Sequence, residues 1–166
     1  MKIKIKKLRK DAVIPSYAIP GDAGMDLTAV SRTFDKDGNI VYGTGIAVEI
    51  PDGYVGFVFP RSSNARTNMY LTNSVGVIDS GYRGEIRLKF KCVTQTWNPL
   101  KVWWKNYVRK NFKDSIDVDN RVQNGYDVGE RIGQLIIMPY PFVEFLEADE
   151  LSETERGAGG YGSSGN

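Results

Sequence analysis

The chain has 166 residues, of which 41% are hydrophobic and 25% are charged, and its formal net charge is +2. This size and composition predict one folded domain and argue against disorder, and the near balance of charge argues against a protein that coats nucleic acid. The sequence has no histidine and one cysteine, Cys92, which excludes Ser-His and Cys-His catalysis, intramolecular disulfides and zinc sites built from histidines or cysteine clusters.

The two ends of the chain carry opposite charges. Residues 1–10 contain six lysines or arginines and no acid, and residues 144–155 contain six acids and no base. We interpret both as solvated stretches. Asp11 and Pro15 follow the basic start too soon for a signal peptide, and no run approaches the about 20 apolar residues that cross a bilayer. The sequence therefore predicts a cytoplasmic protein without membrane contact.

Alternating apolar and polar residues predict β-strands at residues 3–5, 46–50 and 86–92. Each segment should bury one face and expose the other. The turn signals between the predicted elements are Asp37-Gly38, Pro51-Asp52-Gly53, Asn124-Gly125 and Asp127-Val128-Gly129. Many short strands separated by glycine and proline favour a sandwich, jelly roll or barrel.

The first motif is Ala-Gly-Met-Asp-Leu-Thr-Ala at residues 23–29. It indicates that a strand begins near Asp26. A bound metal could use this carboxylate directly or through water. Because the chain lacks histidine and has a single cysteine, any metal should be held by oxygen, which favours Mg²⁺ or Ca²⁺.

The second motif, Pro-Arg-Ser-Ser-Asn-Ala at residues 60–65, predicts one or two helical turns over residues 63–66. A serine near the start of this helix should cap its free backbone N–H groups. Arg61, Ser62 and Ser63 would together suit an anion. The simpler alternative is a capped helix with a surface arginine.

The third motif spans residues 76–86 and places Asp79 between an apolar run and a glycine-containing turn. It predicts a β-hairpin with a carboxylate at its mouth. In a chain without histidine, a carboxylate is the natural group to orient and deprotonate a water molecule. The alternative is an aspartate that only caps the backbone of the turn.

Residues 95–124 differ from the rest of the chain. They contain all three tryptophans, Trp97, Trp103 and Trp104, and five basic residues with no acid lie between Trp97 and Lys113. Apolar residues at near-helical spacing allow an amphipathic helix or a long hairpin.

A fourth motif, residues 130–137, reads as a strand whose polar interruptions are Arg131 and Gln134.

The last motif, residues 156–165, contains the pattern G-x-G-x-x-G. A dinucleotide site would need a helix after this pattern, and no further residues follow to form one. The glycines, Arg156 and the serines nevertheless suit a phosphate, and the ring of Tyr161 suits stacking on a base. A solvated tail is the alternative.

In this order, the five motifs resemble those of the trimeric dUTP pyrophosphatase (dUTPase) family. The matching segments are residues 23–29, 60–65, 76–86, 131–136 and 156–165. The resemblance implies a mainly β, jelly-roll-like (β-clip) subunit with a short helix after the second motif. It also implies one domain over residues 1–155, with an insertion at about 95–124, and a flexible glycine-rich arm over 156–166. Some phage-encoded relatives carry an extra segment at this place.

The resemblance implies a homotrimer that hydrolyses dUTP to dUMP and pyrophosphate with Mg²⁺. Asp79 would activate the water that attacks the α-phosphorus, and Asp26 would hold Mg²⁺ through coordinated water. Tyr82 would lie against the deoxyribose and exclude a 2′-hydroxyl, and Arg131 would support the site. The other residues implied to bind substrate are Arg61, Ser62, Ser63 and Gln134 at the phosphates, Asn73, Gly76, Val77 and Ile78 at uracil, and Arg156, Gly160, Tyr161, Gly162, Ser163 and Ser164 in the closing arm.

Two other functions are left open by the sequence. The dCTP deaminase family has a similar fold and a second motif that residues 61–66 fit, but Lys89 stands where that family carries its catalytic glutamate. A regulatory binding protein is the other alternative. Its partner surface would be residues 95–124, which could contact a protein or nucleic acid or could pack on their own subunit.

Overall fold

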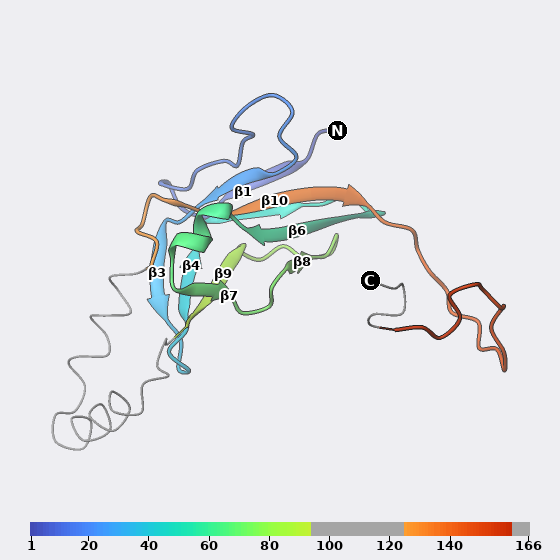
Figure 1. Ribbon diagram of the computed structural model, residues 1–166. Coiled ribbons are helices and arrows are strands. Elements are labelled where there is room, and N and C mark those ends of the chain that lie inside the picture. Colours follow the sequence, from blue (N-terminus) through green and yellow to red (C-terminus); the bar gives the residue numbers. More distant parts are fainter. Residues whose placement is uncertain (94–124, 161–166) are drawn as a thin grey trace, which may run out of the picture.

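The computed structural model describes residues 1–93 and 125–160 (Figure 1). Within them lie ten β-strands and one short 3₁₀ helix, and every named strand pairing is antiparallel. The predicted mainly β fold is therefore confirmed. Residues 95–124, for which the sequence allowed a helix or a hairpin, fall outside the described residues. No helix in the described part of the chain has the length and apolar character needed to span a membrane.

The strands form two four-stranded sheets and one two-stranded ribbon (Figure 1). The first sheet has the order β2 (Met25–Thr28), β10 (Arg131–Pro139), β6 (Tyr54–Pro60) and β8 (Gly76–Ile78). The second has the order β3 (Ser31–Phe34), β4 (Ile40–Gly43), β9 (Arg87–Cys92) and β7 (Met69–Leu71). The ribbon pairs β1 (Lys4–Lys7) with β5 (Ile46–Glu49).

The core lies between the two sheets. Leu27 and Leu135 of the first sheet belong to the same buried cluster as Tyr42 and Phe90 of the second. The rings of Tyr42 and Phe90 meet edge to face, with their centroids 5.8 Å apart. Burying a large apolar side chain contributes about 1.5–3 kcal/mol, so this cluster is the main source of stability.

Strand burial follows the sequence pattern in β9 but not in β5. In β9, Leu88 and Phe90 are buried while the basic residues that alternate with them, Arg87, Lys89 and Lys91, are exposed, as predicted. In β5, Glu49 is exposed as predicted, but the prediction is wrong for Ala47, which is buried between Ile46 and Val48. Alanine carries little hydrophobic signal, so the alternation could not reveal that this position is buried.

The third motif does not form the predicted hairpin. Strand β8 pairs with β6 in the first sheet, whereas β9 pairs with β4 and β7 in the second. The residues between β8 and β9 therefore cross from one sheet to the other, and a turn closed by the Tyr82 N–H and the Asp79 carbonyl (3.1 Å) begins the crossing. Alternation predicts that two segments are strands but does not reveal which partner each one takes.

The helix after the second motif is η1 (Ser62–Arg66), a 3₁₀ helix. Its N-cap residue is Arg61, and no side chain caps the helix start, so the predicted serine cap is wrong. The end is closed by Thr67, whose hydroxyl donates to the Asn64 carbonyl at 2.8 Å. Three of the predicted turns agree with the structure, because Gly38, Gly53 and Gly129 all have the positive φ that glycine adopts readily.

Candidate functional site

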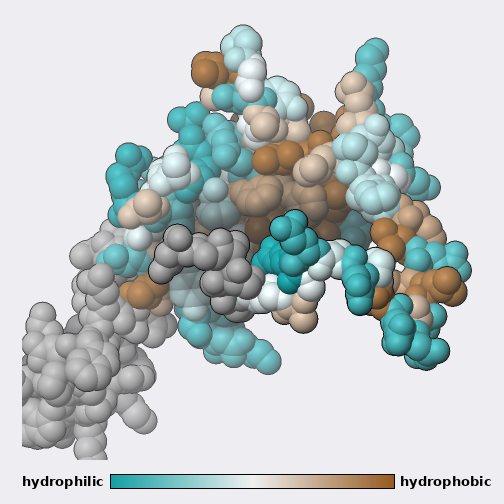
Figure 2. Space-filling model, turned by 45° about the vertical axis from the view of Figure 1, so that its right-hand side comes forward, coloured by the Kyte–Doolittle hydropathy of each residue, from teal (hydrophilic) through white to brown (hydrophobic). Residues whose placement is uncertain are grey.

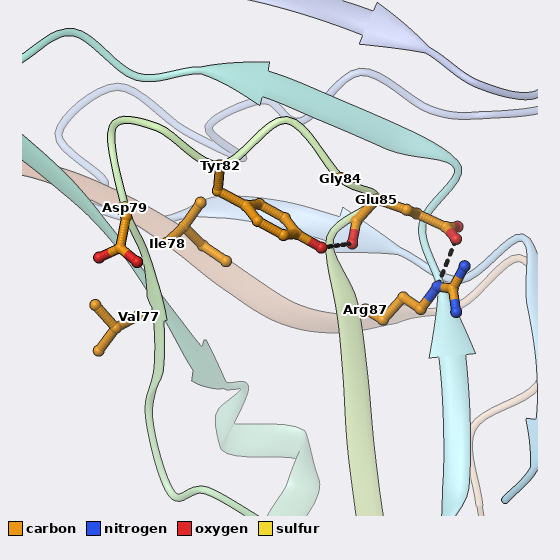
Figure 3. A pocket seen from close by; sticks show the side chains of 7 residues that line it. All are labelled: Val77, Ile78, Asp79, Tyr82, Gly84, Glu85 and Arg87. Carbon is orange, nitrogen blue, oxygen red and sulfur yellow. Dashed lines mark hydrogen bonds and ion pairs between the residues drawn. The ribbon is translucent and has the colours of Figure 1, made fainter.

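One pocket of about 500 Å³ lies beside β8 and the crossing loop (Figure 3). Its lining residues are Val77, Ile78, Asp79, Tyr82, Gly84, Glu85 and Arg87. Val77 and Ile78 end β8 against β6, and the loop then carries Asp79 and Tyr82 past the pocket. The third motif thus supplies both a carboxylate and an aromatic ring to one concave surface.

The Tyr82 ring folds back along the loop, as Figure 3 shows. Its hydroxyl donates to the Glu85 carbonyl at 3.0 Å. Gly84 lies beneath the ring, and a Cβ added there would come within 2.6 Å of Tyr82 Cζ. Since real Cβ contacts are never this short, the tyrosine can occupy this position only because residue 84 is glycine.

Glu85 holds the loop to the second sheet, and although it lies within the third motif, sequence reasoning did not single it out. Its carboxylate accepts from the Gly45 N–H at 2.8 Å and from Arg87 Nε at 2.7 Å. Gly43 makes room for this contact, because a Cβ at that position would lie 2.6 Å from Glu85 Oε1. The signal available in the sequence was an acid directly before the apolar strand that starts at Ile86.

A second group of charged residues surrounds Asp26. The strand β10 lies between β2 and β6, which brings Asp26, Arg131 and the end of β6 together. Arg61 Nε donates to one Asp26 oxygen at 2.8 Å, and Arg131 Nη1 donates to the other at 3.0 Å. The Asp26 side chain is only 10% exposed. Two cations around one carboxylate leave an excess positive charge.

This group borders a second pocket of about 440 Å³. The lining residues are Arg61, Ser63, Arg66, Thr67, Gly125, Tyr126, Gly129, Glu130 and Arg131. Three arginines and one glutamate make the lining basic, and Ser63 adds a hydroxyl donor. Arginine binds carboxylate and phosphate oxygens in paired hydrogen bonds, so this pocket suits an anion.

The two pockets have no lining residue in common. Asp79, Tyr82, Val77 and Ile78 therefore gather in one place, and Arg61, Ser63 and Arg131 gather in another. The other predicted residues lie near one or the other. Gly76 is in β8 with the Asn73 side chain beside it, Ser62 starts η1, and Gln134 is half-buried in β10 opposite Asp26.

The C-terminal motif is described only in part. Arg156 Nε donates to the Gly159 carbonyl at 3.1 Å, which closes a local turn, and Gly160 is exposed. The predicted residues Tyr161, Gly162, Ser163 and Ser164 lie outside the described residues. In the described ranges, no cluster of three or more acids, cysteines or histidines could by itself hold a metal ion.

Comparison with known proteins gives consistent matches. The dUTPase family model matches residues 10–102. The deoxyuridine 5'-triphosphate nucleotidohydrolase of Hydrogenobaculum sp. is 37% identical, and the alignment covers 99% of each chain. The enzyme of the same name from Nautilia profundicola is 38% identical over 99% of each chain. A solved structure of the Staphylococcus bacteriophage 80alpha dUTPase with dUPNHPP is 27% identical, covers 99% of each chain and superposes with a TM-score of 0.71.

Proposed function

This chain belongs to the dUTPase family and hydrolyses dUTP, and we propose that Asp79 activates the water molecule that attacks the α-phosphorus. The observation that carries this proposal is the pocket in which the Asp79 carboxylate and the Tyr82 ring lie together. In the proposed step, Asp79 takes a proton from the water as its oxygen bonds to the α-phosphorus. The bond between that phosphorus and the α,β-bridging oxygen breaks, and pyrophosphate leaves from dUMP.

The basic pocket would hold the triphosphate. Arg61, Ser63 and Arg131 present donors there, and Asp26 holds both guanidinium groups in place. Pre-arranged donors stabilise charge that develops in the transition state without a cost of reorganisation. In the other pocket, Tyr82 would lie against the deoxyribose, and the backbone of residues 76–78, in the edge strand of the first sheet, would bind uracil.

We propose Mg²⁺ as the cofactor, with Asp26 as the protein group that holds it through water. Both Asp26 oxygens already accept a hydrogen bond from an arginine, so a contact through water fits better than direct coordination. Mg²⁺ favours oxygen ligands and keeps several waters, and the triphosphate can supply the direct ligands. When bound, it would neutralise part of the triphosphate charge.

We also propose that the complete site forms between subunits of a homotrimer. The two pockets share no residue, so neither holds all the predicted groups. The segment after β10 leaves the sheets (Figure 1) and exposes large apolar side chains: Phe142 is 91%, Phe145 94% and Leu146 93% exposed. Figure 2 shows hydrophobic side chains at the surface of one face. Exposed apolar surface of this kind is typical of protein interfaces.

The function is tested by measuring pyrophosphate release from dUTP, dCTP, dTTP and UTP with Mg²⁺. We expect hydrolysis of dUTP and little hydrolysis of the others. Ammonia release from dCTP would instead indicate the deaminase, which the sequence disfavours because Lys89 stands where that family carries its catalytic glutamate. A folded protein that hydrolyses none of the four would favour the regulatory alternative. The cytoplasmic location stays a prediction from sequence.

Gly84→Ala should weaken the discrimination between dUTP and UTP. The added methyl group would displace the Tyr82 ring, and because that ring is exposed it can swing away at little cost to stability. We expect the ratio of kcat/KM for dUTP over UTP to fall about tenfold, a change typical of losing one packing contact. Kinetics with both nucleotides would show it.

Gly81→Ala is the matched control for this prediction. It changes a glycine of the same loop, where an added Cβ would meet nothing within 4 Å. We expect its selectivity to equal that of the wild type. Equal selectivity in both variants would show that the position of the Tyr82 ring does not govern the choice of sugar.

A further inference from the structure

Tyr126 joins the hydrophobic core to the basic pocket. It is only 5% exposed, and its ring packs edge to face against Tyr42 and Phe90, with centroids 6.2 Å and 5.9 Å away. Its carbonyl accepts from the Tyr42 hydroxyl at 2.9 Å and from Arg32 Nη1 at 3.0 Å. These two ring contacts and two hydrogen bonds hold the backbone and the ring of Tyr126 firmly.

The hydroxyl of this fixed ring reaches into the pocket. It lies 3.2 Å from Ser63 Oγ, and either oxygen is able to donate. The second partner of Ser63 decides between them. Arg61 Nη1 approaches Ser63 Oγ at 3.5 Å, and because a guanidinium can only donate, Ser63 accepts there. A serine oxygen has two acceptor positions and one proton, so one acceptor position and the proton remain.

An anionic ligand settles the direction of the remaining bond. A phosphate oxygen accepts but cannot donate, so Ser63 must turn its proton toward it. The Tyr126 hydroxyl then donates to the free acceptor position of Ser63. The result is a chain in which Tyr126 donates to Ser63 and Ser63 donates to the anion, and each bond in such a chain strengthens the next.

We infer that Tyr126 is a positioning residue that holds the Ser63 hydroxyl as a hydrogen-bond donor to a substrate phosphate. The inference rests on the proposed function, since it takes the basic pocket as the triphosphate site. Tyr126 does not touch the substrate in this role and acts through Ser63. The rigid packing of its ring matters because a mobile phenol would leave Ser63 free to point its proton elsewhere.

The test is a double-mutant cycle with Tyr126→Phe and Ser63→Ala. Phenylalanine keeps the ring and its packing and removes only the hydroxyl. We expect Tyr126→Phe to lower kcat/KM for dUTP about three- to tenfold, the value of one neutral hydrogen bond. In the Ser63→Ala background, the same change should have no further effect, because the group through which Tyr126 acts is gone.

Two results would overturn the inference. One is an unchanged kcat/KM in Tyr126→Phe. The other is an equal loss in both backgrounds, which a purely structural role of Tyr126 would produce. Tyr70→Phe, a change at an exposed tyrosine of β7, is the matched control and should match the wild type.

The same cycle can be measured by the binding of the analogue dUPNHPP, which tests the inference without turnover. Tyr126→Phe should weaken binding by a similar factor in the wild-type background alone. A failure of dUTP hydrolysis with the binding cycle intact would count against the proposed reaction and still support the positioning role. Normal hydrolysis with additive effects in the cycle would count against Tyr126 alone.

Discussion

Asp79→Asn should lower kcat for dUTP hydrolysis by about 10²–10⁴-fold, the contribution typical of a general base. The amide keeps the size and shape of the side chain but cannot accept the proton of the attacking water. Asp79 is exposed, and within the described part of the chain its side chain makes no hydrogen bond or ion pair, so the fold should survive. Pyrophosphate release under saturating dUTP and Mg²⁺ measures the effect directly.

Asp37→Asn is the matched control for this variant. It makes the same chemical change at an exposed aspartate in the turn between β3 and β4, at the far end of the other sheet. Its kcat should equal that of the wild type. If Asp79→Asn folds and turns over dUTP at the wild-type rate, another group activates the water and the proposed role of Asp79 is wrong.

Deleting residues 156–166 should leave a folded trimer with little activity. We propose that this arm closes over the phosphates with Arg156 and its backbone N–H groups. Loss of pre-arranged donors and of water exclusion should lower kcat/KM by about 10²-fold or more. Of the deleted residues, those that the structure describes contribute nothing to the core. The midpoint of thermal unfolding and the sedimentation coefficient should therefore stay unchanged.

Arg156→Ala separates charge from length in this prediction. It keeps the whole arm and removes one cation, so its activity should lie between those of the wild type and the truncated protein. Glu153→Gln, a charge change just before the deleted segment, is the control and should be fully active. Normal turnover by the truncated trimer would show that the arm has no part in the reaction.

The predicted site residues fall into two classes. Asp79 and Tyr82 are three positions apart, so a single turn brings them to one pocket, and the third motif was enough to group them. Asp26 lies 35 residues from Arg61 and 105 from Arg131. Only the pairing of β10 with both β2 and β6 brings these three together. The motifs named each of them but gave no sign of their contact.

The sequence motifs did not predict the roles of Tyr126 and Glu85. Both act through contacts with residues far away in the chain, Tyr126 with Ser63 and Glu85 with the turn after β4. Tyr126 lies in none of the five motifs, and Glu85 lies in the third motif without any local sign of its contact. The three tryptophans of residues 95–124 and the arm residues Tyr161 to Ser164 remain predictions from sequence alone.

The sequence by itself determined the mainly β fold, the turns at Gly38, Gly53 and Gly129 and the family. Those features depend on residues close together in the chain, through alternating polarity, backbone freedom and contiguous motifs. Only the tertiary structure decided that β8 and β9 belong to different sheets and that Asp26 holds two arginines. The reason is physical: a strand shows the same alternation whichever partner it pairs with, and the partner is chosen by packing across the whole core.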